Sequence, residues 1–430
     1  MIKFESTAPV MPKKLPSSIE LLTSRVPEKL KPAVAHAVFP ALGAHLCGVR
    51  FRYIDQVEHE PAFMCCLFAK MSSGKSAVNA PIDYILADIL ERDSVNRLRE
   101  AEYKELLRRF PRGMNRPDRP KDLLIQVLSS DMTNAAFVQR LKDANGHFLY
   151  SQMDEIELLH QLKAGRNGQQ VSQLLRLAFD CGRYGQERVG IDAITANVRV
   201  RWNFNVSSTI GGGKFFFKDD LTNGTITRLN FCTIEHQTGD DMPIIGAYGQ
   251  PFADALKPYI DRLNAASGLI ECKEAEEMAM KLKDENAEFA QLSDNEAFEV
   301  LSYRANVIAY HKAMLIYLME GRKWSTEIAD FMRWSEEYDL WCKMKFFGEA
   351  LQMLIGQEKN EGKRGPQNML DLLPDTFTKD QAKEMRRSQG LNEETYEMLR
   401  NWKRRNFITF DKETGIYKKG ENYIQKQRVA

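Results

Sequence analysis

Between about residues 50 and 235, short apolar runs alternate with stretches of helical spacing. The run 61–69, PAFMCCLFA, contains no charged residue, which is typical of a strand buried on both faces of a sheet. Further apolar runs predict strands at 51–54, 123–128, 148–153 and 231–234. One long charged stretch of helical spacing runs from Ser76 to about Phe110. Strands that alternate with helices predict an α/β core with a mostly parallel sheet.

The segment 195–206, TANVRVRWNFNV, has a different pattern, because apolar and polar residues alternate strictly. The apolar face would hold Val198, Val200, Trp202 and Phe204. This pattern predicts a half-buried strand whose polar face ends at Asn205.

The rest of the chain divides by composition. Residues 1–34 begin rich in Pro, Ser and Lys and predict a mobile or wrapping N-terminal arm, ahead of the α/β core at 35–238. After a connector rich in Gly and Pro, residues 252–358 show apolar positions three to four apart and predict an all-α region. A second linker leads to a C-terminal unit at 366–430.

The C-terminal unit has the element order of a winged helix. A short helix and turn precede a helix at 379–390, and a third helix follows Asn392. Its apolar face would be formed by Tyr396, Leu399 and Trp402. A hairpin around Gly415 comes last, so we expect a winged-helix-like fold.

Charge and cysteine content limit the possible binding surfaces and the expected cellular compartment. Sixty Lys and Arg against 59 Asp and Glu leave a formal charge of +1, so any nucleic-acid surface must be a local patch. Seven cysteines without a CxxC pair argue against a disulfide framework or a zinc ribbon. No run approaches the roughly 18 apolar residues of a membrane span, and the N-terminus lacks a signal-peptide core. We therefore expect a cytoplasmic protein without a membrane partner.

The segment Ala69–Ser76, AKMSSGKS, follows the most apolar strand and precedes a helix, which is the setting of a phosphate-binding P-loop. Lys75 would reach the β- and γ-phosphates of ATP, and Ser76 would hold Mg²⁺. The nucleotide-binding residues would be Ser72, Ser73, Gly74, Lys75 and Ser76. Ala69 stands where most P-loops have Gly. The alternative is a surface Ser-Gly-Lys-Ser turn.

Asp154 and Glu155 follow the strand FLYSQM and supply the carboxylates that such a site needs. Asp154 would bind the metal, and Glu155 would orient the attacking water. An ordinary charged helix start is the alternative. Asp131, after the run 123–128, is a competing strand end that we interpret as a helix cap or a supporting group.

Two further residues are candidates for catalysis. Asn205, expected at a strand tip, could hold the lytic water or the γ-phosphate, or could simply face solvent. Arg228, in TNGTITRL, could stabilise charge on the transferred phosphoryl group in cis or from a neighbouring subunit. Its alternative is a structural salt bridge. The segment 211–219, GGGKFFFKD, predicts a mobile loop whose aromatics either stack on bases or pack into the core.

The end of the third C-terminal helix and the hairpin are basic. Helix and hairpin could contact DNA phosphates together through Arg400, Lys403, Arg404, Arg405, Lys418 and Lys419. The alternative is a unit used only for protein contacts.

Taken together, FPALGAH (39–45), MSSGKS (71–76), SDMTNAAFVQRL (130–141), FLYSQMDE and TNGTITRLN (222–230) give the chain a family resemblance over about 35–350. It resembles an uncharacterised family of bacterial P-loop proteins of phages and mobile elements. Members are often encoded beside or fused to primase modules and are loosely described as helicase-like. The resemblance implies a RecA/AAA-type ATPase core with Lys75, Ser76, Asp154 and Arg228 in its motif positions.

The leading hypothesis is therefore an ATP-dependent, DNA-acting motor or helicase-like ATPase that serves replication or maintenance of a phage or mobile element. It would be a homo-oligomer with ATP at subunit interfaces, and a primase or another replication protein is an expected partner. One alternative is an ATP-switch loader, and another is a DNA-binding initiator or regulator with little turnover. A small-molecule kinase is disfavoured, because the helical region and the C-terminal unit would be unusual additions to one.

Overall fold

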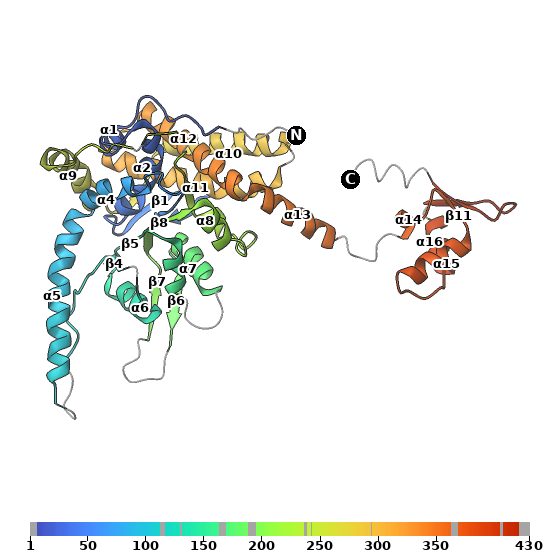
Figure 1. Ribbon diagram of the computed structural model, residues 1–430, viewed down its shortest axis with the longest axis horizontal. Helices are drawn as coiled ribbons and strands as arrows, with labels where there is room; N and C mark the ends of the chain where they lie inside the picture. The colour runs from blue at the N-terminus through green and yellow to red at the C-terminus, as the bar shows by residue number, and fades with distance from the viewer. Residues whose placement is uncertain are drawn as a thin grey trace. The chain divides into compact units, whose positions relative to one another are not determined.

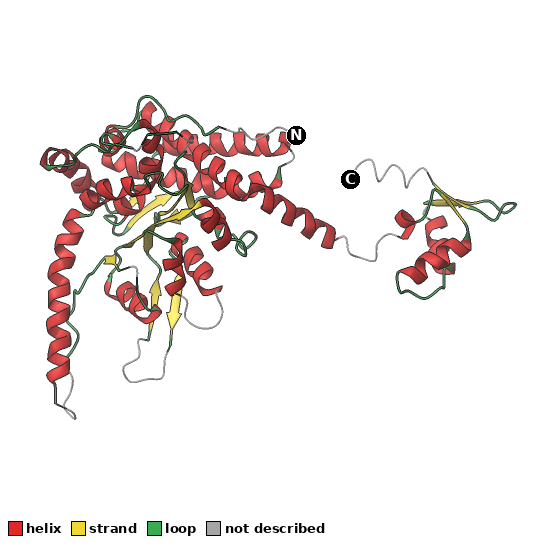
Figure 2. Cartoon of the chain, in the orientation of Figure 1, coloured by secondary structure: helices red, strands yellow, loops and turns green. Residues whose placement is uncertain are grey.

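The structure is a computed structural model that describes residues 7–111, 117–129, 131–162, 169–187, 195–235, 239–241, 243–293, 295–362, 369–404 and 407–420. The chain forms two compact units, Met1–Met353 and Leu354–Ala430. Figure 1 traces the chain from its N-terminus in blue to its C-terminus in red, and Figure 2 marks helices and strands.

A five-stranded sheet lies at the centre of the first unit. Its spatial order is β4 (Val127–Leu128), β5 (Leu149–Met153), β8 (Trp202–Thr209), β3 (Met64–Ala69) and β9 (Asn230–Cys232). All four pairings are parallel. Every residue of β3 is buried, as its unbroken apolar run predicts. The predicted α/β core with a mostly parallel sheet is confirmed.

Two smaller sheets accompany the main one. β1 (Val49–Arg52) pairs with β10 (Gly268–Ile270) and with β2 (Glu58–His59), so the strand predicted at 51–54 belongs to a separate sheet. β6 (Arg183–Gln186) and β7 (Ala196–Arg199) form an antiparallel ribbon.

The strand predicted at 195–206 is wrong in two respects. The segment is divided between β7 in the ribbon and β8 in the main sheet, and β8 continues to Thr209. β8 is also buried on both faces rather than half-buried, because it lies between β5 and β3 with Asn203 and Asn205 inside.

Short helices begin the chain and pack on the body. The N-terminal arm is anchored, because Ile19 and Leu22 are fully buried and Trp334 Nε1 donates to the Pro9 carbonyl at 3.1 Å. The elements here are α1 (Ser17–Thr23), the 3₁₀ turn η1 (Glu28–Leu30), α2 (Lys31–Ala37) and α3 (Phe39–Gly43). α2 and α3 both lie against β3.

The long helix expected from Ser76 to about Phe110 is broken into three pieces. It begins as the 3₁₀ turn η2 (Lys75–Val78), continues as α4 (Asn79–Ile85) and, after Leu86, becomes α5 (Ala87–Arg109). The far end of α5 extends away from the sheet (Figure 1). The remaining elements between the strands are α6 (Asn134–Asp143), η3 (Ile156–Leu162), α7 (Gln169–Phe179), α8 (Ile210–Phe216) and η4 (Ile226–Arg228).

The region predicted as all-α is mostly helical but also contains the strand β10, and as far as Met353 it belongs to the same compact unit as the sheet. It contains α9 (Gln250–Asn264), α10 (Lys273–Ser293), α11 (Glu296–Met319), α12 (Thr326–Lys343), the π-helical segment η5 (Met344–Gly348) and α13 (Glu349–Gly362). α12 packs on β9, where Asp339 accepts a hydrogen bond from the backbone of Phe231 at 2.7 Å.

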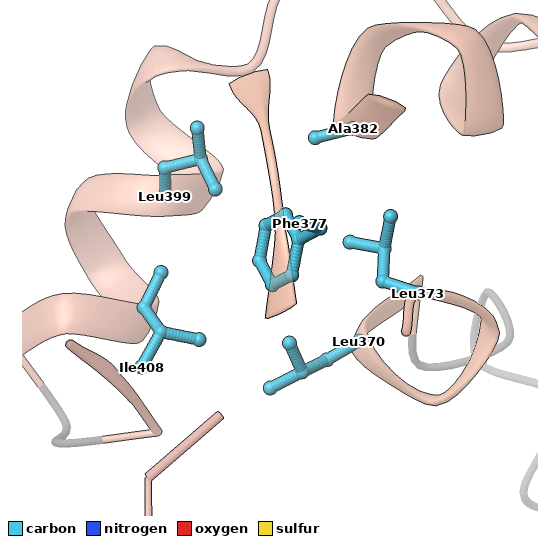
Figure 3. Packing of buried hydrophobic residues seen from close by; sticks show 6 residues of the cluster. All are labelled: Leu370, Leu373, Phe377, Ala382, Leu399 and Ile408. Carbon is cyan, nitrogen blue, oxygen red and sulfur yellow. The ribbon is translucent and has the colours of Figure 1, made fainter. Parts of the chain in front are cut away.

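After the end of α13, the described residues of the second unit form three helices and a three-stranded antiparallel sheet of order β11-β13-β12. In chain order the elements are α14 (Met369–Leu372), β11 (Thr376–Phe377), α15 (Lys379–Ser388), α16 (Tyr396–Arg404), β12 (Ile408–Phe410) and β13 (Tyr417–Lys419). Its own small core, shown in Figure 3, is formed by Leu370, Leu373, Phe377, Ala382, Leu399 and Ile408. Trp402 packs against this core as expected, but Tyr396 is 64% exposed, so its predicted place on the apolar face is wrong.

Candidate active site and basic surface

The carboxyl ends of β3, β5 and β8 lie at one edge of the main sheet, because these strands are parallel. Ala69 at the end of β3 is opposite Thr209 at the end of β8, and Met153 at the end of β5 is opposite Val206. After β3 the chain next enters the main sheet at β4, on one side, and after β8 it next enters at β9, on the other side. Ligands of open parallel sheets bind outside the carboxyl ends of neighbouring strands whose connections run in opposite directions along the sheet. The boundary between β3 and β8 is therefore the expected ligand position.

The loop 70–76 leaves β3 at this boundary. Its backbone enters the left-handed region at Ser72, with φ of 59°, and at Gly74, with φ of 85°. Glycine is needed at position 74 for two reasons. Its φ is strained for other residues, and a Cβ there would lie 2.9 Å from the ring of Pro243.

Polar side chains of this loop are available for a ligand. Lys75 Nζ donates to the carbonyl oxygen of Lys70 at 3.3 Å, so the ammonium reaches back across the loop. Ser72 and Ser76 are exposed. Ser73 is 2% exposed, and its hydroxyl has no hydrogen-bond partner within the described part of the chain. A buried hydroxyl without a partner costs about 1–3 kcal/mol, and an oxyanion in the loop would provide one.

Asp154 and Glu155 come directly after β5, at the same edge as the loop. Both are exposed, and the 3₁₀ helix η3 begins immediately after them at Ile156. β8 lies between β5 and β3, so two strand spacings, about 10 Å in all, separate the strand before the carboxylates from the strand before the loop.

A chain of side-chain hydrogen bonds joins these elements. Asn205 on β8 donates to the Tyr150 hydroxyl at 3.0 Å, and that hydroxyl donates to Gln152 Oε1 at 2.6 Å. Gln152 Nε2 in turn donates to Oδ1 of Asn79, the first residue of α4, at 3.2 Å. Burial raises the pKa of Tyr150, so its hydroxyl keeps the proton it donates. The network fixes the end of β5 against the helical segment that follows the loop.

Asn205 is placed differently from the expectation. It lies inside β8 rather than at its tip, and it is 4% exposed. Its amide also donates to the carbonyl of Ala37 at 2.8 Å. Asn205 therefore holds α2 and Tyr150 in place, and its predicted position at the strand tip is wrong.

Sequence reasoning missed Gln152 and Asn79 as site residues, and missed Ser208 and Thr209 as the true end of β8. A signal was present in FLYSQM, because polar residues inside a buried strand need partners. Ser151 accepts a bond from Trp202 Nε1 at 3.0 Å, and Gln152 has the partners described above.

Arg228 lies at the amino ends of the parallel strands, whereas the loop lies at their carboxyl ends. It ends the turn η4 just before β9, and β9 pairs with β3 such that Asn230 is opposite Cys65. Arg228 is thus about 20 Å, or six residues of strand, from the end of β3. Its Nε donates to Asp180 Oδ2 at 3.2 Å, so the salt bridge named as an alternative is present. The structure does not bring Arg228 to the loop of its own chain.

The segment 211–219 is helical rather than an open loop over most of its length. Thr209 caps α8 by accepting a bond from the backbone N–H of Gly212 at 3.1 Å. Phe217 is fully buried, whereas Phe215 is 70% exposed with Lys218 Nζ 4.5 Å from its ring centre. The competing Asp131 does not cap α6, because Thr133 does.

The basic residues of the second unit gather on α16 and the hairpin. Arg400, Lys403, Arg404 and Lys418 are exposed. Lys419 is largely covered and lies 3.9 Å from Asp375. Arg405 lies outside the described residues.

Within the described ranges, no three His, Cys, Asp or Glu side chains converge on a point where they could hold a metal ion. Ser76 and Asp154 could contribute two oxygen ligands, which suits Mg²⁺ because this ion keeps several waters and takes its other ligands from substrate phosphates. None of the helices in the described part of the chain is long and apolar enough to cross a membrane.

Comparison with protein-family models gives no match for this sequence, and comparison with curated proteins gives no significant match.

Proposed function

We propose that the chain is a Mg²⁺-dependent P-loop ATPase that acts on DNA. The hydrogen bond from Gln152 to Asn79 carries the proposal, because it ties the strand before Asp154 and Glu155 to the helical segment that begins at Lys75. The loop 70–76 and the acidic pair are thereby held at the same end of the sheet, as a phosphate site would require.

The position of β8 between β5 and β3 supports this proposal. A separation of about 10 Å between the ends of β3 and β5 leaves room above β8 for a γ-phosphate and an attacking water. Carboxylates set directly beside the loop would repel the phosphates, whereas carboxylates one strand further away act through a metal ion and a water.

Each residue then has a defined task. The loop amides and Lys75 bind the β- and γ-phosphates, and Lys75 offsets charge that develops on the transferred group. Ser76 and Asp154 hold Mg²⁺, which would neutralise phosphate charge when bound. Glu155 orients the attacking water.

DNA is the proposed partner because of the second unit. Its helices, its β11-β13-β12 sheet and its hairpin support a winged-helix-like domain, with the basic face of α16 as the surface that meets DNA. We propose that the assembly is a homo-oligomeric motor for a phage or mobile replicon, with Arg228 acting on a neighbouring subunit and a primase or similar replication protein as a partner.

The test is ATP hydrolysis by the full-length chain, measured alone, with single-stranded DNA and with duplex DNA. Turnover stimulated by DNA supports the motor. Slow turnover with ATP-dependent assembly on DNA supports the alternative of a switch or loader. Absence of hydrolysis under all three conditions would contradict the ATPase and leave a DNA-binding regulator.

A further inference from the structure

The second unit contains a hollow of about 470 Å³ on the basic face of α16. Tyr396, Arg400 and Lys403 line it, and they follow one another at the spacing of a single helix face. Lys379, at the start of α15, and the rings of Phe410 and Tyr417 complete the wall. Helix, helix start and hairpin thus meet around one concave site.

The aromatic side of this hollow packs against the core of the second unit. Tyr417 stacks on Phe377 with ring centres 5.5 Å apart, and Phe410 lies 4.5 Å from Tyr417. Phe377 belongs to the core shown in Figure 3. Tyr396 contrasts with these rings, because it is 64% exposed and contributes nothing to that core. Phe410 and Tyr417 are half-buried, so the ring of Tyr396 is the most exposed aromatic face at the hollow and is open to a ligand.

The cationic side of the hollow is only partly neutralised. Arg400 lies 3.2 Å from Glu397 in an exposed pair, and such pairs are worth about 0–1 kcal/mol. Lys403 Nζ sits 5.7 Å from the centre of the Phe410 ring. Lys379 and Arg404 make no ion pair with any residue that the structure describes. The site therefore attracts an anion with a flat apolar part.

A nucleotide within a strand has this chemistry. The hollow lies within the range of small-ligand pockets, about 300–1,000 Å³, and every base has a face that can stack on an aromatic ring. In a duplex those faces are already stacked on neighbouring base pairs, so only an unpaired base can use Tyr396. Phosphates on either side would meet the lysines and arginines.

We propose that this hollow binds single-stranded DNA, with one unpaired base stacked on Tyr396 and the flanking phosphates held by Lys379, Arg400 and Lys403. The inference rests on the proposed function only in that this chain acts on DNA. It goes further by naming unpaired strand, rather than duplex, as what the second unit takes.

The experiment uses the full-length chain without ATP, so it does not depend on the nucleotide site. Fluorescence anisotropy would measure binding of a labelled oligothymidylate of about 20 nucleotides and of a duplex of equal length. Tyr396→Ala should weaken oligothymidylate binding by about 5- to 100-fold, while Tyr396→Phe should keep it within about twofold because the ring remains. Arg387→Ala is the matched control, because Arg387 is an exposed cation paired with Glu393 and does not line the hollow.

A second readout locates the contact directly. An oligothymidylate carrying 5-iodouracil should photocrosslink to the peptide that contains Tyr396, and Tyr396→Ala should abolish that crosslink. Equal weakening of duplex and single strand by Tyr396→Ala would overturn the inference, since the ring would then serve an ordinary duplex surface. Unchanged affinity together with no crosslink at Tyr396 would also overturn it. Failure to bind either DNA would contradict this inference and the proposed partner together, whereas loss of ATP hydrolysis alone would bear only on the proposed ATPase.

Discussion

The side-chain amide of Gln152 donates a hydrogen bond to Asn79 Oδ1 at 3.2 Å. Gln152 lies two residues before Asp154, and Asn79 lies three residues after Ser76. One bond therefore links the strand that presents the carboxylates with the helical segment that follows the loop. It also explains why a buried strand contains a glutamine.

Gln152→Leu tests this link. The substitution removes the donor to Asn79 and the acceptor for Tyr150, so the carboxylates lose a fixed position relative to the loop. We expect the rate of ATP hydrolysis to fall by about tenfold and the melting temperature to fall by a few degrees. Tyr150→Phe removes both bonds of the hydroxyl but leaves the bond between Gln152 and Asn79, and should have a smaller effect. Wild-type hydrolysis by Gln152→Leu would show that the bond does not position the site.

Arg228 can be tested against its salt bridge. If Arg228 acts on a neighbouring subunit, mixtures of Arg228→Ala and Lys75→Ala proteins should regain some hydrolysis, because a mixed interface can join an intact loop to an intact arginine. Asp180→Asn provides the control, since it breaks the ion pair but keeps the guanidinium. A purely structural role predicts that Asp180→Asn and Arg228→Ala lose activity alike and that no mixture recovers it.

The pH dependence of folding should report on Glu336. Burial raises the pKa of this carboxyl to about 8, and its Oε1 accepts bonds from Asn286 and Asn306 while Oε2 has no partner among the described residues. A folded-state pKa above the unfolded value means that the stabilisation is complete below about pH 4.5 and is lost as pH rises to about 8. The loss is at most about 1.4 kcal/mol per pH unit.

Glu336→Gln isolates this effect, because an amide keeps the acceptor and cannot ionise. In denaturant titrations the variant should match the wild type near pH 4.5 and become the more stable protein by pH 8. Parallel stability curves for the two proteins across that range would show that Glu336 is not protonated in the fold.

The basic end of α16 should contribute to DNA binding through phosphates. Charge reversal of Lys403 and Arg404 to Glu should weaken binding and reduce the log–log salt slope by about one unit for each phosphate that the variant no longer neutralises. The fold should persist, because Leu399 and Trp402 pack on the other side of the helix. An unchanged slope would indicate a unit used for protein contacts.

The buried strand β3 and the order of strand, loop and helix around 64–85 could be predicted from the sequence, because an unbroken apolar run has few alternatives. The end of β8 could not. Ser207, Ser208 and Thr209 have the composition of a turn, yet they are paired in register with β3, and only the neighbouring strand makes them part of the sheet.

The exposed position of Tyr396 is a second feature that could not be predicted from the sequence pattern. Positions 396, 399 and 402 are each three residues apart, and three residues fall about 60° short of a full turn. Tyr396 and Trp402 therefore point about 120° apart, so both cannot face one small core. Leu399 and Trp402 pack there, and Tyr396 is left on the basic face.

The central claim is that the loop and the acidic pair form one ATPase site, and hydrolysis by matched variants tests it most directly. Release of phosphate from ATP should be measured for the wild type, Lys75→Ala, Glu155→Gln and Asp131→Asn, together with binding of labelled ATP. We predict that Lys75→Ala abolishes hydrolysis, that Glu155→Gln binds ATP without turnover, and that Asp131→Asn keeps wild-type activity. Hydrolysis at the wild-type rate by both Lys75→Ala and Glu155→Gln would contradict the account.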